Sequence, residues 1–118
     1  MTYVDGFVLP VPKNKIEEYK KMAVWGKKVW MKHGALQYFE CVGDDLAGMP
    51  ESGNFKKMAG LKPNETAFFS FIVFKSKAHR DAVNKKVMKE MQKQGPMPSM
   101  PFDLKRMAFG GFKTLVQG

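Results

Sequence analysis

Cysteine and histidine are scarce in this sequence. Cys41 is the single cysteine among 118 residues, and His33 and His79 are the two histidines. One cysteine excludes a disulfide within the chain and indicates a reducing compartment such as the cytoplasm. Three soft ligands at such wide spacing do not form a zinc-binding pattern. We therefore expect neither a disulfide framework nor a bound metal.

Long apolar runs and phosphate-binding loops are missing as well. No stretch approaches the roughly 18 residues of a membrane-spanning helix. The first residues, MTYVDG, lack the basic and apolar regions of a secretory signal. No glycine-rich loop of the Walker or dinucleotide type occurs. These absences predict a cytoplasmic protein that does not enter a membrane and that uses no cofactor.

Acidic side chains are outnumbered by basic ones. The chain has 20 Lys and Arg against 11 Asp and Glu, which gives a formal net charge of +9. A charge of that sign leaves nucleic acid or an acidic ligand open as partners. The cations are mostly lysines spread over the predicted helices and loops, which is typical of a solvated surface. With 44% hydrophobic and 26% charged residues, we expect one globular domain covering 1–118.

The strongest structural signal is the segment 66–75, TAFFSFIVFK. Its phenylalanines and β-branched residues predict a strand, because such side chains pack well on a pleated surface. Alternation places Phe68 and Phe74 on one face of this strand. Phe69 and Phe71 fall on the other face. Both faces are apolar, so the strand needs cover on both sides.

The remaining regular elements follow from periodicity and from capping residues. Alternating patterns predict three further strands, at 2–11, 35–42 and 107–116. Apolar residues three and four apart predict two helices, one from the cap Asn14 to Gly34 and one from the cap Ser76 to Gly95. Gly110 and Gly111 in the last strand predict a bulge or a close approach by another backbone.

Two segments are predicted to be irregular. Residues 43–65 are rich in turn formers and too long for a hairpin connection, so they predict a functional loop or an arm, with Phe55 anchoring a short helical turn. Residues 95–101 hold three prolines, which remove backbone donors, and predict an extended connector. Met97 and Met100 in this connector are expected to fill the core or to lie over a pocket or a partner subunit.

The element order is β-α-β-β-α-β, which predicts the α+β class. With right-handed crossovers it folds most simply as a ferredoxin-like plait, a four-stranded antiparallel sheet with both helices on one face. Two helices cover only one face, although the strand 66–75 is apolar on both. The second face needs either another copy of the chain, giving a dimeric α+β barrel, or flat ligands such as nucleic-acid bases. We favour the homodimer, because such an open face exceeds the usual apolar patch of a monomer.

Four separated stretches also form a recognisable pattern, namely MTYVDGFVLPVP at 1–12, HGALQYFECVGDD at 33–45, FSFIVFKSKAHRD at 69–81 and MPFDLKRMAFGGF at 100–112. Together they resemble the bacterial YbaA-like proteins, a family of unknown function placed with the dimeric α/β barrels. The match runs from end to end and is weakest over 22–31 and 46–61. The resemblance implies the fold and a homodimer. It implies no known reaction and no catalytic residues.

Two carboxylates, Asp5 and Glu40, stand in mid-strand among apolar neighbours. Inside a barrel such a group is desolvated and can serve as a proton acceptor. It can equally form a structural hydrogen bond or a salt bridge, for which Arg106 and Lys105 near the last strand are candidate partners. Both roles stay open, and we take Asp5, Glu40 and Arg106 as candidate ligand-binding residues.

His79 and Arg80 fall in the first turn of the second predicted helix and are the other candidate ligand-binding residues. Free backbone N–H groups at such a turn attract anions, and with Arg80 they would hold a carboxylate or phosphate. In the alternative, His79 and Asp81 complete the helix cap while Arg80 pairs with an acid across the surface. A histidine without a partnered carboxylate or nucleophile is weak support for acid–base catalysis. No catalytic residue is assigned, and whether the chain is an enzyme stays open.

Two functions fit these patterns. The first is a homodimer that binds a small apolar or anionic ligand in a cavity, with a cofactor-free monooxygenase-like activity as one form; this rests on fold analogy. The alternative is RNA binding, because the strand 66–75 partly matches the third strand of RNA-recognition motifs, which share the element order. Phe69 and Phe71 would then stack on bases. Ala67 and Phe68 replace the basic residue and the glycine of that motif, so we favour the first function.

Overall fold

The structure is a computed structural model that describes residues 1–95 and 100–118. Within these ranges one open sheet of four antiparallel strands is accompanied by three α-helices and two short 3-10 helices. The α+β class is therefore confirmed. In these ranges no helix combines the length and the apolar character needed to span a membrane. Most of the predicted connector 95–101, with Met97, lies outside the described residues.

The elements occur where the residue patterns predict them, with ends that differ by a few residues. The strands are β1 (Tyr3–Pro12), β2 (Gln37–Val42), β3 (Glu65–Phe74) and β4 (Ala108–Lys113). The helices are α1 (Ile16–Lys32), α2 (Phe55–Ala59) and α3 (Lys77–Gln94). The 3-10 turns are η1 (Lys13–Lys15) and η2 (Leu104–Arg106). The helical turn predicted around Phe55 is α2.

Two predicted boundaries are wrong. Asn14 does not cap the first helix, because the chain passes from Pro12 through η1 and α1 begins at Ile16 without a side-chain cap. The last strand ends at Lys113 rather than at 116, because its partner β1 begins at Tyr3, directly opposite Lys113. Local sequence carries little information on either point, since both ends depend on where a neighbouring element begins.

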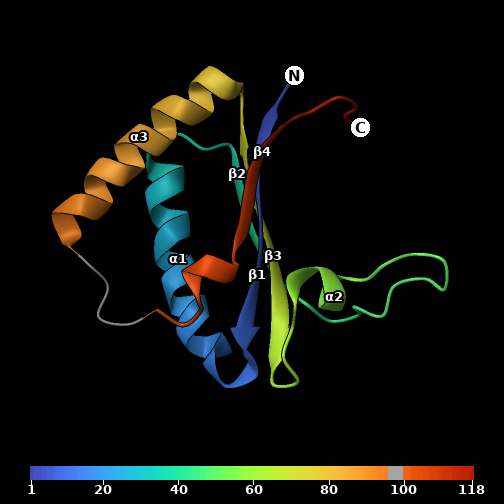
Figure 1. Ribbon diagram of the computed structural model, residues 1–118. Coiled ribbons are helices and arrows are strands. Elements are labelled where there is room, and N and C mark those ends of the chain that lie inside the picture. The colour runs from blue at the N-terminus through green and yellow to red at the C-terminus, as the bar shows by residue number, and fades with distance from the viewer. Residues whose placement is uncertain (96–99) are drawn as a thin grey trace.

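The strand order β2-β3-β1-β4 places the two ten-residue strands at the centre of the sheet. β3 pairs with β1 along its whole length, starting with Phe74 opposite Tyr3, and with β2 on its other edge. Figure 1 shows the sheet nearly edge-on, with α1 and α3 on one side and α2 with its long loop on the other. The segment 66–75 is therefore an inner strand.

The face of the sheet toward α1 and α3, here the inner face, carries the core. Leu9, Ile72 and Phe74 are buried on it. Val29 of α1 and Val87 of α3 pack against this side of β3. These contacts bury the apolar stripes of both long helices, which is the main source of stabilisation in a domain of this size.

The opposite face of the sheet, here the outer face, is apolar and is open except at the end where α2 lies and Pro10 and Ala67 are buried. Its outward-pointing strand residues are Val4, Gly6, Val8 and Pro10 in β1, Gln37, Phe39 and Cys41 in β2, Glu65, Ala67, Phe69, Phe71 and Val73 in β3, and Ala108, Gly110 and Phe112 in β4. Phe39, Phe69 and Phe112 are 44%, 46% and 62% exposed. Phe39 stacks on Phe71 with ring centroids 4.7 Å apart. The prediction that the central strand is apolar on both faces is confirmed.

One of the two glycines of β4, Gly111, makes room for a neighbouring side chain. A Cβ on Gly111 would collide with the ring of Tyr3, which crosses from β1. The register runs through Gly110 and Gly111 without an extra residue, so β4 has no bulge at this point. The predicted bulge is wrong, and the close approach is made by a tyrosine ring rather than by a backbone.

The start and the end of α3 follow the predicted capping pattern. Ser76 Oγ accepts a hydrogen bond from the backbone N–H of His79 at 3.1 Å, and Gly95 follows the helix with a φ of 77°. His33 Nε2 lies 2.8 Å from Glu90 Oε1, which ties the end of α1 to the middle of α3. The two long helices are thus fixed to each other as well as to the sheet.

We expect Phe74→Ala to lower the free energy of unfolding by about 3–5 kcal/mol, because it deletes a buried ring and leaves a cavity in the core. Phe74 is 0% exposed. Urea denaturation followed by far-ultraviolet circular dichroism measures the change. Leu115→Ala is the control, since Leu115 is 81% exposed and its loss should change stability by less than about 0.5 kcal/mol. Equal effects of the two substitutions would contradict the assigned core.

Candidate functional site

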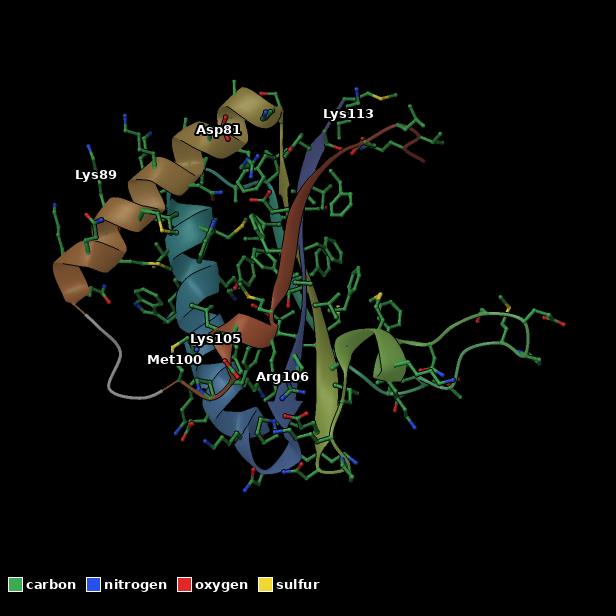
Figure 2. All side chains as sticks on the ribbon, in the orientation of Figure 1. Asp81, Lys89, Met100, Lys105, Arg106 and Lys113 are labelled. Atoms are coloured by element: carbon green, nitrogen blue, oxygen red, sulfur yellow. The ribbon has the colours of Figure 1, made fainter. Side chains whose placement is uncertain are left out.

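A cavity of about 720 Å³ lies between the inner face of the sheet and the helices α1 and α3. Its wall is mostly apolar and includes both tryptophans of the chain, Trp25 and Trp30. The segment that leads into β4 contributes Phe102 and Met107. Figure 2 places Met100 beside α1, where it also lines the cavity. Met100 therefore lies over a pocket, which is one of the two roles predicted for it.

Glu40 of β2 carries the most heavily hydrogen-bonded polar group on this wall. Its Oε1 accepts hydrogen bonds from the hydroxyl of Tyr19, at 2.8 Å, and from that of Ser70. Its Oε2 accepts one from the hydroxyl of Tyr38 at 2.6 Å. Strand geometry explains two of these donors, because Ser70 lies directly opposite Glu40 on β3 and Tyr38 is two residues away on the same face of β2.

The hydroxyl groups of Tyr19 and Tyr38 remain protonated at neutral pH. Burial is the largest cause that raises the pKa of each phenol above its ordinary value, and the charge of the nearby Glu40 carboxylate raises it further. Burial and the negative charge of the neighbouring carboxylate both disfavour the ionised phenolate. The two tyrosines therefore act as hydrogen-bond donors to Glu40 and not as bases.

Asp5 of β1 lies on the same wall, diagonally across β3 from Glu40. It is 1% exposed. Arg80 Nη1 donates to its Oδ1 at 3.0 Å, and Asn84 Nδ2 donates to its Oδ2 at 3.1 Å. Asn84 Oδ1 in turn accepts a hydrogen bond from Trp30 Nε1 at 2.9 Å. Burial raises the pKa of Asp5, while Asn84 and Arg80 oppose that shift.

The guanidinium group of Arg80 lies among three neighbouring residues, although its buried Nε has no hydrogen-bond partner with suitable geometry in the described part of the chain. Besides its bond to Asp5, its Nε lies 2.9 Å from the Asp81 carboxylate. Its Nη2 donates to the hydroxyl of Tyr3 at 3.3 Å, and its Cζ lies 4.9 Å from the centroid of the Tyr3 ring. Arg80 therefore pairs with an acid, as in the predicted alternative, but its hydrogen-bonded partner Asp5 is buried and does not lie across the surface. A further anion would have to compete with both Asp5 and Asp81.

His79 completes the cap of α3. Its Nδ1 accepts a hydrogen bond from the backbone N–H of Lys75 at 2.9 Å, and its ring meets the edge of Phe74 with centroids 5.9 Å apart. His79 is not among the described residues that line the cavity. The structure therefore favours the capping role over a role in the cavity.

Arg106 binds Glu65 instead of a mid-strand carboxylate. Its Nη1 and Nη2 donate to the two carboxylate oxygens at 2.7 and 2.8 Å, and Nη2 also donates to the carbonyl oxygen of Gly60 at 2.7 Å. Figure 2 shows Arg106 near one end of the central strands. Within the described residues neither Asp5 nor Glu40 forms a salt bridge with Arg106 or Lys105, the candidate partners that the sequence left open. The reason is that η2 lies beside the first residues of β3, away from mid-strand.

The remaining metal and thiol candidates add nothing to the cavity. Among residues 1–95 and 100–118, no three His, Cys, Asp or Glu side chains gather closely enough to hold a metal ion. Cys41 is a free thiol on the outer face. The polar chemistry of the site thus comes from carboxylates, hydroxyls and the amides of Asn84 and Gln94.

Sequence reasoning named Arg80 but missed the other groups that bind Asp5 and Glu40. Tyr38 could have been found, because it lies two residues before Glu40 and alternation puts both on one face. Ser70 is the one polar residue between Phe68 and Ile72 on the inner face of β3. Tyr19 and Asn84 had no such signal, since only helix packing brings them to the sheet.

The fold and the cavity define a small α+β protein in which two long helices cover one face of an open sheet. The chain belongs to a family described as a protein of unknown function (DUF1428), whose model matches residues 2–104. It is 38% identical over 116 residues to the uncharacterized protein YbaA of Escherichia coli (strain K12), with 98% of each chain covered. YbaA of Shigella flexneri matches with the same identity and coverage. The resemblance to YbaA-like proteins is therefore confirmed.

One solved structure has a weak overall likeness. A de novo designed protein, Foldit4, aligns with a TM-score of 0.41 at 10% identity, covering 98% of each chain. A likeness of that strength supports no inference about fold or function.

We expect Glu65→Gln to remove a pH-dependent part of the stability. The hydrogen bonds from Arg106 are the main cause that lowers the pKa of Glu65 from 4.5 to about 2. Because the pKa is lowered in the folded state, the pair contributes fully above the ordinary pKa and its contribution is lost as the pH falls toward 2. The loss at pH 7 should be on the order of 2–3 kcal/mol.

Urea denaturation at pH 7, 4 and 2.5 measures this effect. The difference between the wild type and Glu65→Gln should shrink steadily as the pH falls. Glu51→Gln is the control, because Glu51 is exposed in the loop before α2. A difference that is the same at all three pH values would contradict the lowered pKa.

Proposed function

We propose that this protein binds a small, mainly apolar molecule in the cavity between the sheet and the helices. The observation that carries the proposal is the cavity itself, with a volume of about 720 Å³ and an aromatic and methionine-rich wall that holds few polar groups. Known ligand pockets have roughly this size, about 300–1,000 Å³, and the same composition.

The polar groups of the wall favour binding over chemistry. Tyr19 and Tyr38 are protonated donors that are already used by Glu40. Asp5 is neutralised by Arg80. The monooxygenase-like activity expected from fold analogy would require a reactive group at this wall, and neither the two tyrosines nor Asp5 is free to act as one. We therefore propose a storage, transport or sensing role.

The outer face supports a second part of the proposal, namely that two copies of the chain pack sheet against sheet as a dimeric α+β barrel. Phe39, Phe69 and Phe112 are between 44% and 62% exposed on that face. The strand order β2-β3-β1-β4, with both long helices on one side, is the order that a ferredoxin-like plait would have and so supports this part of the proposal. An exposed aromatic sheet face of this kind marks an interaction surface.

Charge favours a second copy over RNA as the cover of the outer face. None of the outward-pointing strand residues is a lysine or an arginine. Nucleic-acid binding depends on cations that contact phosphates, even when aromatic side chains stack on the bases. The lysines of the long helices lie on the other side of the sheet, and Figure 2 shows Lys89 projecting away from it.

The cytoplasm remains the proposed location, supported by the single free cysteine.

Ligand binding is tested by isothermal titration with phenylhexanol, an apolar neutral probe with a terminal phenyl group. We expect a dissociation constant below about 1 mM for the wild type. Ala23→Phe should weaken binding at least tenfold, because Ala23 lines the cavity on α1 and a phenyl ring would fill it. Met31→Phe is the matched control, since Met31 is on α1 but exposed.

A second cavity variant protects this test against misfolding. Met91→Trp adds bulk from α3 to the same space and should weaken binding in the same way. Circular dichroism checks that each variant is folded. Wild-type affinity in a folded Ala23→Phe or Met91→Trp protein, or no binding by the wild type, would contradict the proposal.

The dimer is tested by light scattering over a range of concentrations. We expect a mass of twice the 13.4 kDa of one chain. Phe69→Lys should give a monomer, because it places a charge in the apolar contact. Met31→Lys is the control on the helix side and should remain dimeric. A monomeric wild type would contradict the dimer, and RNA binding by the outer face would then be tested through its dependence on salt.

A further inference from the structure

We propose that the ligand of the cavity is an organic cation, such as an amine with an apolar body, and that Glu40 is the group that binds its charge. This inference rests on the proposed function and specifies its ligand class. It also replaces the anionic ligand that the sequence left open. Four features of the structure lead to it: a free acceptor position on Glu40, a missing counter-charge, a nearby aromatic wall and the contrast with the other buried carboxylates.

The carboxylate of Glu40 has room for one more hydrogen-bond donor. An ionised carboxylate offers about four acceptor positions on its two oxygens. Tyr19 and Ser70 use the two positions on Oε1. Tyr38 uses one on Oε2. One position on Oε2 therefore stays open, and Glu40 lines the cavity.

Glu40 also lacks a counter-charge in the described part of the chain. All of its partners are neutral hydroxyl groups, and it takes part in none of the ion pairs found among residues 1–95 and 100–118. Lys20 and Lys27 line a smaller adjoining hollow of about 440 Å³ that Glu40 also borders. Both lysines are exposed, so water solvates their ammonium groups. A partly buried carboxylate without a cation is stabilised when one arrives from outside.

Two other carboxylates of the chain, Asp5 and Glu65, are buried and each is paired with an arginine. Asp5 accepts hydrogen bonds from Arg80 and Asn84. Glu65 accepts hydrogen bonds from the two terminal nitrogens, Nη1 and Nη2, of the Arg106 guanidinium. Each of these acids has its own arginine within the chain. Glu40 alone among the three has none, although it lines the mainly apolar cavity between the sheet and the helices.

The aromatic side chains around the cavity suit the same ligand. Trp25, Trp30 and Tyr38 all line it, and the rings of Trp30 and Tyr38 are 6.1 Å apart between centroids. The faces of such rings attract ammonium groups. The apolar remainder of the wall would contact the body of the molecule. A ligand carboxylate, by contrast, would meet the charge of Glu40 and find Arg80 already paired.

The test compares three probes that share one carbon skeleton and differ in the charge of one end: phenylhexylamine, phenylhexanol and phenylhexanoate. Isothermal titration at pH 7 measures all three with the full-length protein. We expect the amine to bind at least tenfold more tightly than the alcohol, and the carboxylate to bind more weakly than the alcohol. This order is measured on the wild type, so it does not depend on any variant being folded.

Glu40→Gln then assigns the preference to this residue. It keeps the shape of the side chain and removes the charge, so affinity for the amine should fall at least tenfold while affinity for the alcohol changes less than threefold. Glu51→Gln is the matched control and should leave all three affinities unchanged.

The outcomes separate the two proposals. Equal binding of the three probes, or tightest binding of the carboxylate, would overturn the cationic ligand and leave the cavity as a binding site. An unchanged preference in folded Glu40→Gln would overturn the role of Glu40. Failure of all three probes to bind would overturn the proposed function, and the cationic ligand with it.

Discussion

The pairing of β1 with β3 is the constraint on which the rest of the structure depends. Both strands are ten residues long and pair residue for residue, and together they form the centre of the sheet. Side chains alternate between faces, so a shift of one residue would move Asp5 and Leu9 from the inner face to the outer face. The register therefore decides at once what the core contains, which groups face the cavity and which aromatic rings remain outside.

The cavity results from small side chains on the helix that covers the inner face. Ala23 and Gly26 of α1 are buried and line the cavity, where larger residues would fill the space. A Cβ on Gly26 would already come within 3.0 Å of the Tyr38 hydroxyl. The end of α1 is joined to α3, where His33 contacts Glu90. Side chains around an apolar space of this size lose van der Waals contacts that a filled core would give them. Such a loss is consistent with a binding role.

Three carboxylates, Asp5, Glu40 and Glu65, are buried or partly buried, and they differ in whether an arginine or only hydroxyl groups stabilise them. Asp5 and Glu65 each have an arginine, so their charges are neutralised inside the chain. Glu40 is stabilised by hydroxyl groups alone. The first two pairs connect a helix or a turn to the sheet and serve the fold. The third leaves a net negative charge at an apolar cavity, which a fold alone does not require.

The sequence by itself determined the α+β class, the positions of the strands and long helices, and the two apolar faces of the segment 66–75. These features depend on local periodicity and on caps such as Ser76, which neighbouring residues specify. Only the tertiary structure decided the partners of the charged groups. Arg80 meets Asp5 across 75 positions and Arg106 meets Glu65 across 41, and no local pattern encodes such contacts. The cavity also belongs to the tertiary level, because it is the space left between elements that the sequence specifies one at a time.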